Sequence, residues 1–428
     1  MSNREKWDFC RSLSIVDVCR DIGGVQLNGR AKSTHSPFRS QSGKNAFTID
    51  LQRNKFADWG CPVNDNKRGI VCGDPIDFVR YYYDLTPQEA VNYLWNRYHG
   101  GDSIVRRAQH ATIEKSKRND APDLTKEDLD IAYSVFLGLS DLDERSRKYL
   151  KDRDLTDEDI TYFGFKTFPK RTIKKSLNKA LREYEIKPES VPGLYLRKGD
   201  SDASFNFYDA VVLPVRTVRG GIEGLQIRFF DPGTGPKYIW FSSERFCYPD
   251  YVYDGKTPGT PIGFVDKDVE NEKTLFITEG LFKAIAINKC YKCPVLTVQG
   301  VGNFSGIENE LCYVREKYPQ LRRVLIAYDA DFIGNVNVTS HAVRLYRTLQ
   351  TLHPELIYQY VSWDEKYGKG FDDLIANTGG WDVRNIVKTI HMERFATVAE
   401  AIMPEARQLW MEGKRKEIAD LFRSKLYI

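Results

Sequence analysis

The 428 residues of this chain suffice for two or three separately packed domains, because a single core rarely grows beyond about 250–300 residues. Hydrophobic residues make up 41% and charged residues 29%, which is ordinary for a folded globular protein and excludes a disordered chain. The net charge of +4 permits nucleic-acid binding without requiring it, since a basic groove can lie on a nearly neutral protein.

The same composition indicates a cytoplasmic protein without a membrane partner. No apolar run approaches the roughly 20 residues of a membrane-spanning helix. The segment Met1–Trp7 is polar and charged, unlike a secretion signal. Eight cysteines in such a chain favour reduced thiols over a disulfide framework.

The first predicted domain, residues 1–98, is small and contains both helices and strands. A helix is expected over Asp8–Ile22. Alternating residues between Gly and Asn turns predict short strands at Asn45–Leu51 and Lys55–Trp59. The polar segment 99–122 has no periodic apolar face, so we predict a linker there.

Residues 123–271 are expected to form an α+β subdomain in which helices precede strands. The predicted helices are Thr125–Gly138, Asp143–Leu150 and Thr156–Tyr162, and the strands are Ala210–Arg216 and Ile222–Phe230.

Strands and helices alternate over residues 272–380, which predicts a parallel α/β sheet. The predicted strands are Thr274–Ile277, Pro294–Val298, Arg323–Tyr328 and Ile357–Val361, and a helix over Leu281–Lys289 follows the first of them. The remaining residues, 381–428, are amphipathic and are predicted to form a helical tail.

Acidic residues lie directly after, or shortly beyond, three of these strands. Glu279 follows the first, Asp329 and Asp331 follow the third, and Asp372 and Asp373 lie beyond the fourth. Ligand sites in open α/β sheets lie at the carboxyl ends of the strands, so we expect these acids to meet there. Residues two apart on an extended chain face the same way, which would let Asp329 and Asp331 reach one ion.

Carboxylates that converge without His or Cys suit Mg²⁺ or Mn²⁺, which prefer oxygen ligands and stabilise phosphoryl transfer. The alternative for any one acid is a helix cap or a solvated loop charge.

The pattern of Glu279-Gly280 after one strand and Asp329-Ala330-Asp331 after another resembles the Toprim domain of primases, topoisomerases, nucleases and recombination proteins. The segment 329–334 is similar to the D-G-D-x-A-G of DnaG-type primases. Residues 369–374 resemble their G-K-D-P-D-E, with Gly370 in place of the first Asp. Lys283 stands where these primases carry an Asp, which implies one carboxylate fewer and a phosphate contact for Lys283.

Segments before the acids carry the resemblance to primases further. Residues 149–155 and 160–165 are similar to Y-L-x-x-R-G-L and F-x-x-G-Y, and residues 224–228 and 236–239 to the strand ending in G-G-R and to P-K-Y-L-N. The resemblance implies that Arg153, Arg228 and Lys237 contact phosphates of template and nucleotide. The alternative is that this Phe- and Tyr-rich region is simply core.

The N-terminal domain resembles the zinc ribbon of primases, in which C-P-F-H and C-F-G-C supply four ligands. Here the two segments read Ser36-Pro37-Phe38-Arg39 and Asp58-Trp59-Gly60-Cys61, so three ligands are missing and zinc is not expected. His35 and Cys72 lie nearby at spacings that fit no common zinc site, and Cys290 and Cys293 are interpreted as ordinary thiols.

Together the resemblance implies a DNA primase with a Toprim catalytic domain, a basic α+β subdomain and a degenerate zinc ribbon, in a compact form typical of a phage or mobile element. Its reaction would be Mg²⁺-dependent nucleotidyl transfer that makes short RNA primers on single-stranded DNA from NTPs, with a replicative helicase as a candidate partner. The alternatives are a Toprim-family nuclease and a non-catalytic DNA-binding protein of replication assemblies. The sequence contains no P-loop G-x-x-x-x-G-K-[ST], so helicase activity is not expected.

Overall fold

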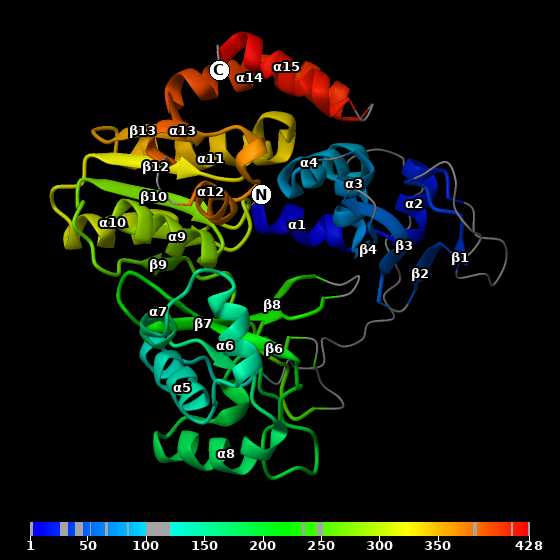
Figure 1. The fold of residues 1–428 in the computed structure, drawn as a ribbon. Coiled ribbons are helices and arrows are strands. Elements are labelled where there is room, and N and C mark those ends of the chain that lie inside the picture. Colours follow the sequence, from blue (N-terminus) through cyan, green and yellow to red (C-terminus); the bar gives the residue numbers. More distant parts are fainter. Residues whose placement is uncertain are drawn as a thin grey trace. The chain divides into compact units, whose positions relative to one another are not determined.

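The computed structural model describes residues 3–25, 33–38, 46–51, 53–64, 67–83, 85–99, 120–232, 236–244, 246, 251–379, 383–411 and 414–426. The chain divides into two compact units: Met1–Arg118 with Asp231–Pro236, and Asn119–Phe230 with Lys237–Ile428 (Figure 1). Most of the predicted linker lies outside the described residues, and the domain boundaries stay predictions.

The N-terminal unit contains a four-stranded antiparallel sheet in the order β1-β2-β3-β4 and four helices. The strands are β1 (Ser33–Thr34), β2 (Phe47–Asp50), β3 (Lys55–Asn64) and β4 (Lys67–Gly73), and the helices are α1 (Asn3–Arg11), α2 (Ile15–Gly23), α3 (Pro75–Tyr83) and α4 (Pro87–Tyr98). The helical segment expected over Asp8–Ile22 is divided between α1 and α2. The backbone of Ser14 is extended and its side chain accepts a hydrogen bond from the N–H of Asp17, which starts a second helix.

Phenylalanines form the centre of this unit. Phe47, Phe56 and Phe78 are at most 2% exposed. The rings of Phe47 and Phe56 stack at 5.5 Å, and Phe78 meets Phe56 edge-on at 5.4 Å. Phe38 packs against Phe78 at 5.3 Å. The strands and α3 are therefore joined by apolar contact, which each large ring supplies in quantity.

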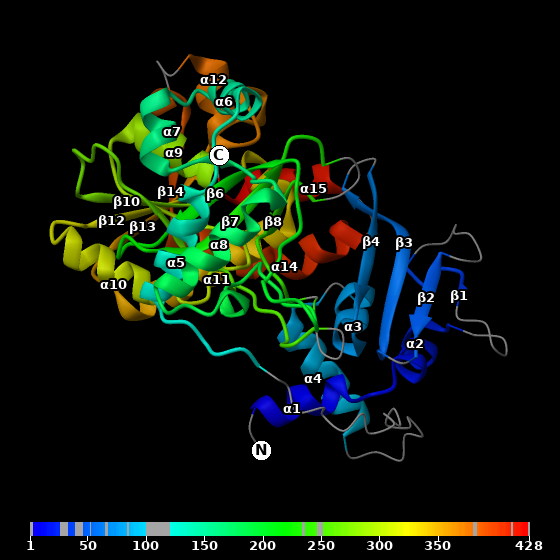
Figure 2. The same cartoon turned by 90° about the horizontal axis from the view of Figure 1, so that it is seen from below.

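The second unit contains two sheets. The first is antiparallel, in the order β5-β6-β7-β8, with strands β5 (Lys166–Thr167), β6 (Ala210–Arg216), β7 (Ile222–Phe229) and β8 (Tyr238–Trp240). Its helices are α5 (Lys126–Gly138), α6 (Glu144–Lys151), α7 (Asp157–Phe163) and α8 (Lys174–Glu183), with short 3₁₀ turns at Arg171–Ile173 and Pro188–Ser190. Figure 2 gives a second view of these elements.

The second sheet has the order β14-β13-β12-β10-β11-β9, in which β13, β12, β10 and β11 are parallel and the two edge strands are antiparallel. The strands are β9 (Gly263–Val265), β10 (Thr274–Glu279), β11 (Val295–Val298), β12 (Arg323–Ala327), β13 (Ile357–Ser362) and β14 (Lys388–His391). The accompanying helices are α9 (Leu281–Tyr291), α10 (Ile307–Lys317), α11 (Val336–Leu352), α12 (Phe371–Thr378), α13 (Val383–Ile386), α14 (Met392–Met411) and α15 (Arg415–Leu426), with 3₁₀ turns η3 (Ala330–Gly334) and η4 (Glu365–Tyr367).

Both faces of the parallel sheet are covered by helices. In β10, Leu275 and Ile277 belong to the core that includes α10, α11, α14 and α15, whereas Phe276 belongs to the core that includes α9 and α12. This alternation follows from the two-residue period of a strand. The predicted fold, a parallel α/β sheet with an α+β subdomain, is confirmed. The tail predicted as mostly helical also contributes the edge strand β14, since Lys388–His391 pairs with β13.

A buried carboxylate of α7 forms a hydrogen bond and ion pairs with lysines of the parallel-sheet region. Asp159, whose side chain is 4% exposed, accepts a hydrogen bond from Lys267 at 2.8 Å and forms an ion pair with Lys289 at 3.4 Å. Burial alone would raise the pKa of Asp159, but the hydrogen bonds from Lys267 and from the N–H of Thr156 outweigh it and bring the pKa to about 2. The carboxylate therefore stabilises the fold above about pH 4, and this contribution is lost as the pH falls toward 2.

We expect Asp159→Asn to lower the free energy of unfolding by about 2 kcal/mol near neutral pH, because the charge that favours the folded state is removed. The difference from wild type should shrink to a small fraction near pH 2, where about half of wild-type Asp159 is protonated as well. Urea unfolding followed by circular dichroism at both pH values measures it. Asp123→Asn is the control, since Asp123 is 95% exposed and pairs only at the surface with Lys256. An equal loss at both pH values would contradict the electrostatic account.

Candidate active site

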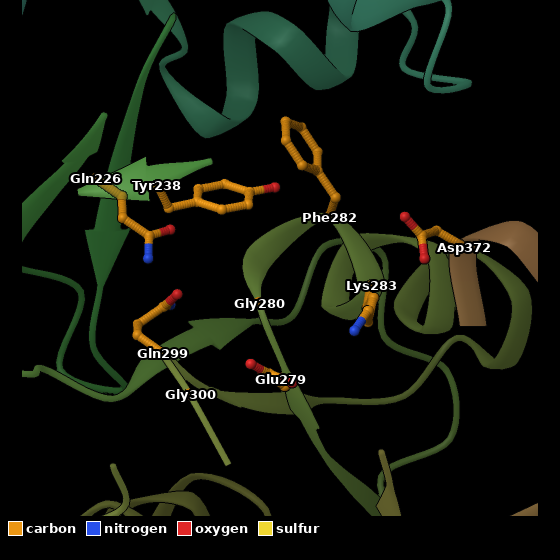
Figure 3. A pocket seen from close by; sticks show the side chains of 9 residues that line it. All are labelled: Gln226, Tyr238, Glu279, Gly280, Phe282, Lys283, Gln299, Gly300 and Asp372. Carbon is orange, nitrogen blue, oxygen red and sulfur yellow. The ribbon is translucent and has the colours of Figure 1, made fainter. Parts of the chain in front are cut away.

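A pocket of about 210 Å³ lies where β10 and β11 end and α9 begins. The antiparallel sheet contributes two residues to it from β7 and β8. Figure 3 shows Gln226, Tyr238 and Gln299 on one side of the pocket, Lys283 and Asp372 on the other, and Glu279 between them. The full lining is Gln226, Tyr238, Glu279, Gly280, Phe282, Lys283, Gln299, Gly300 and Asp372.

The turn from β10 into α9 places two charged side chains in the pocket. Glu279 is the last residue of a strand whose other residues are buried. Gly280 has φ of 86°, a left-handed conformation that other residues rarely adopt, and it lets the chain pass directly from strand to helix. Lys283 then lies in the first turn of α9, on the same side as Glu279.

Three of the predicted metal-binding acids, Asp329, Asp331 and Asp372, lie beside a basic side chain. Lys283 forms a hydrogen-bonded ion pair with Asp329, and Lys369 pairs with Asp331 at 2.8 Å. Arg153 lies 4.0 Å from Asp372.

The expectation that Asp329 and Asp331 share an extended strand is wrong. Strand β12 ends at Ala327, and Asp331 lies in the 3₁₀ turn η3. Nevertheless both acids act electrostatically on Glu279. Asp331 keeps one buried oxygen, Oδ1, for which the described part of the chain offers no hydrogen-bond partner.

Burial and neighbouring charges shift the titration of the pocket residues. Burial raises the pKa of Glu279, and Asp329 and Asp331 raise it further against the opposing effect of Lys283. Burial also raises the pKa of Asp372, together with the nearby Asp373. Burial alone would lower the pKa of Lys283, but Asp329 and Glu279 outweigh it, so the pKa is raised and the ammonium stays charged.

Asp373 has a structural position. Its Oδ2 accepts a hydrogen bond at 3.2 Å from the N–H of Gly370, which caps the start of α12. It is absent from the pocket lining, whereas its neighbour Asp372 is part of it. Asp373 therefore acts as a helix cap, which is the alternative given above for any one of the acids.

Two of the four predicted phosphate-binding residues, Arg153 and Arg228, lie together among aromatic rings. The guanidinium of Arg228 lies 4.8 Å from the ring of Tyr238 and 5.8 Å from that of Tyr149, and Arg153 lies 4.9 Å from Tyr149. Both Nε atoms are buried, and neither has a hydrogen-bond partner in the described structure. Lys237 is exposed and lies outside the pocket lining, although its carbonyl accepts a hydrogen bond from Arg228 at 3.3 Å.

Two glutamines of the pocket were missed by the sequence analysis. Gln226 is 7% exposed, and the Nε2 of Gln299 is buried without a partner among the residues described. Gln299 directly follows β11, so the strand-end rule that located Glu279 could also have found it. Gln226 lies inside β7, where no sequence signal distinguishes it from a core residue.

The acids suit a divalent cation only as a partial ligand set. The described residues contain no group of three or more His, Cys, Asp or Glu side chains placed to hold a metal ion. Mg²⁺ commonly takes only one or two carboxylates and completes its shell with water and substrate phosphates. Two features favour a cation at this position. Among the described residues the buried Oδ1 of Asp331 has no hydrogen-bond partner, and the charges of Asp329 and Asp331 act against that of Glu279.

The sequence of this chain is similar to those of known proteins. Residues 267–381 match a family model described as a domain of unknown function, DUF3854. The DNA primase of Thermotoga maritima is 24% identical over 391 residues, which cover 88% of this chain and 60% of that primase. The DNA primase of Listeria monocytogenes is 23% identical over 239 residues, 53% of this chain and 35% of that protein.

Among solved structures, the Aquifex aeolicus primase with its zinc-binding and RNA polymerase domains matches 100% of this chain and 98% of its own, with 20% identity and a TM-score of 0.46. The chain spans about 60% and 35% of the length of the two curated relatives named above. Over most of its length the chain is similar in sequence to bacterial DNA primases, which confirms the resemblance to primases that its motifs indicate.

Proposed function

We propose that this protein is a DNA primase that joins ribonucleoside triphosphates into short RNA primers on single-stranded DNA. The observation that carries the proposal is a pocket in which Glu279, at the end of β10, and Asp372, in α12, lie opposite Gln226 and Tyr238 of the antiparallel sheet and Gln299 directly after β11. The sequence similarity to bacterial primases supports it.

In this proposal the acids hold Mg²⁺ or Mn²⁺, with Glu279, Asp329, Asp331 and Asp372 as the candidate ligands and Asp373 fixing the start of α12. The bound ion would stabilise the charge that develops on the attacking and leaving oxygens of nucleotidyl transfer. The work of the chain itself is to hold and orient the reactants around this position.

The other residues of the pocket suit the rest of the nucleotide. Tyr238 offers a ring face for a base or sugar, and the amides of Gln226 and Gln299 offer hydrogen bonds to polar edges of base or ribose. Arg153 and Arg228, interleaved with Tyr149 and Tyr238, suit the phosphates and bases of a single strand. Lys369 lies beside Asp331 and is exposed enough to reach a triphosphate.

Incubation of the full chain with single-stranded DNA, NTPs and Mg²⁺ tests the function. Short RNA products on a denaturing gel would support a primase. Shortened DNA would instead support the Toprim-family nuclease, and DNA binding without products would support the non-catalytic replication assembly protein.

The partners proposed are the single-stranded template, NTPs and a replicative helicase, and the place of action is the cytoplasm. In the part of the chain that the structure describes, no helix is both long and apolar enough to cross a membrane.

We expect the N-terminal unit to fold without zinc. A structural zinc site requires four N, S or O ligands in tetrahedral geometry. Ser36 is buried and its hydroxyl oxygen accepts a hydrogen bond from the N–H of Phe38 at 3.1 Å, while Arg39 and the side chain of Cys61 lie outside the described structure. The packed rings of Phe38, Phe47 and Phe56 supply apolar stabilisation that a zinc ribbon obtains from its metal.

Elemental analysis of the purified chain, before and after treatment with a chelator, measures zinc content, and circular dichroism measures folding. The expected result is no stoichiometric zinc and an unchanged melting curve. About one zinc per chain, lost together with structure, would contradict this prediction and return His35, Cys61 and Cys72 as ligands.

A further inference from the structure

Lys283 lies inside the cluster of acids. Its ammonium is bonded to Asp329, and both side chains are about four-fifths buried, with exposed fractions of 20% and 19%. Lys283 also lines the same pocket as Glu279 and Asp372. Figure 3 shows the ammonium between Glu279 and Asp372.

Gly370, in the loop before α12, lies close to both Lys283 and Asp372. A Cβ at Gly370 would lie 3.1 Å from Cε of Lys283 and 2.4 Å from Oδ1 of Asp372. The second distance is shorter than any real Cβ contact. A side chain at position 370 would require the Asp372 carboxylate or the end of the Lys283 side chain to move. Glycine at this position therefore suits the present arrangement of both.

Lys369 is attached to the cluster in a different way. Its side chain is 56% exposed and contacts only one oxygen of Asp331, at 2.8 Å. The other oxygen of Asp331 is buried and has no partner among the described residues. An exposed surface pair of this kind is weak, so an arriving cation can displace Lys369 from Asp331.

From these contacts we propose that Lys283 is a fixed internal cation that fills the position of a divalent ion among Glu279, Asp329 and Asp372. The site then takes one divalent ion, on the Asp331 side of the cluster. A second divalent ion near Glu279 and Asp372 would lie against a buried ammonium, and like charges at such a distance repel strongly where water is scarce. This inference rests on the proposed metal-dependent function of the same pocket.

Titration of the full chain with Mn²⁺ alone, followed by electron paramagnetic resonance of the free ion, counts the ions bound. Wild type should bind one, and Lys283→Gln should bind two, because the neutral amide frees the carboxylates that the ammonium occupies. Lys283→Met provides the same loss of charge with a side chain of similar length. Lys369→Gln is the matched control: it should still bind one ion, several-fold more tightly, because a displaceable competitor is gone.

Two ions in wild type, none in wild type, or one in both Lys283 variants while circular dichroism shows them folded would overturn the inference. Because no nucleotide or DNA is present, the count is independent of primer synthesis. A chain that binds one Mn²⁺ and makes no primer overturns the proposed function alone, and a chain that makes primers with two ions overturns this inference alone.

Discussion

Asp329→Asn should reduce primer synthesis by at least about 100-fold, since several kcal/mol of charge stabilisation at the reacting phosphate depend on the ion that the carboxylate helps to hold. The amide has the size of the carboxylate, so the fold should survive. It also releases Lys283, which loses the ion pair that now fixes it. Glu279→Gln should have a similar effect on synthesis. Gel assays over a range of Mg²⁺ concentrations measure both.

Asp364→Asn is a suitable control, because Asp364 is a surface acid, 58% exposed, that pairs with Lys366 outside the pocket. Its activity and melting temperature should equal those of wild type. Full activity of both the Asp329 and the Glu279 variants would remove the metal assignment. Loss of activity together with loss of the folded signal would show instead that the ion pair with Lys283 is a requirement of the fold.

The parallel sheet could be predicted because its strands are buried on both faces. Thr274–Ile277 and Ile357–Val361 appear in the sequence as nearly continuous apolar runs, and the observed strands β10 and β13 extend them by no more than two residues. The edge strands β9 and β14 were missed. They are three and four residues long, and β14 has exposed residues on most of its length, so neither carries a recognisable pattern.

The acids of the site could be located from their positions after strands, but their contacts could not. The pairing of Lys283 with Asp329 joins residues 46 positions apart, and nothing local to either residue specifies it. Gln226 enters the pocket from the antiparallel sheet, 53 positions before Glu279 in the chain, and periodicity within β7 indicates only a buried strand. Pairing across a fold is fixed by topology and packing, which a single sequence does not display.

The sequence shows that zinc ligands are missing from the N-terminal domain, but it shows only in part how the side chains of that domain pack. Phe38, Phe47 and Phe56 lie in one aromatic cluster. Phe78 completes the cluster from α3. Contacts between a helix and strands that are separate in the sequence follow from the tertiary structure, and a single segment of sequence does not reveal them.

Arg228→Ala and Lys237→Ala should both weaken binding to single-stranded DNA, but for different reasons. Arg228 is 7% exposed, and its guanidinium donates to the carbonyls of Phe229 and Lys237, each at 3.3 Å. Its removal should therefore lower the melting temperature as well as the affinity, since it leaves those carbonyls without this donor. Lys237 is exposed, so its removal should cost one phosphate contact and leave the melting temperature unchanged.

The dependence of DNA affinity on salt separates the two contributions. Each phosphate contact that is lost should reduce the slope of log K against log salt by about 0.7 for a single strand. Lys237→Ala should show this change alone, and Arg228→Ala should show it with a loss of stability. Lys179→Ala on α8 is the control, because Lys179 is 80% exposed and contacts Glu183 on the same helix, away from the pocket. If Arg228→Ala lowered stability and left the slope unchanged, Arg228 would be a packing residue of the β7–β8 turn, and the phosphate contacts of the template would have to come from Arg153 and the exposed lysines.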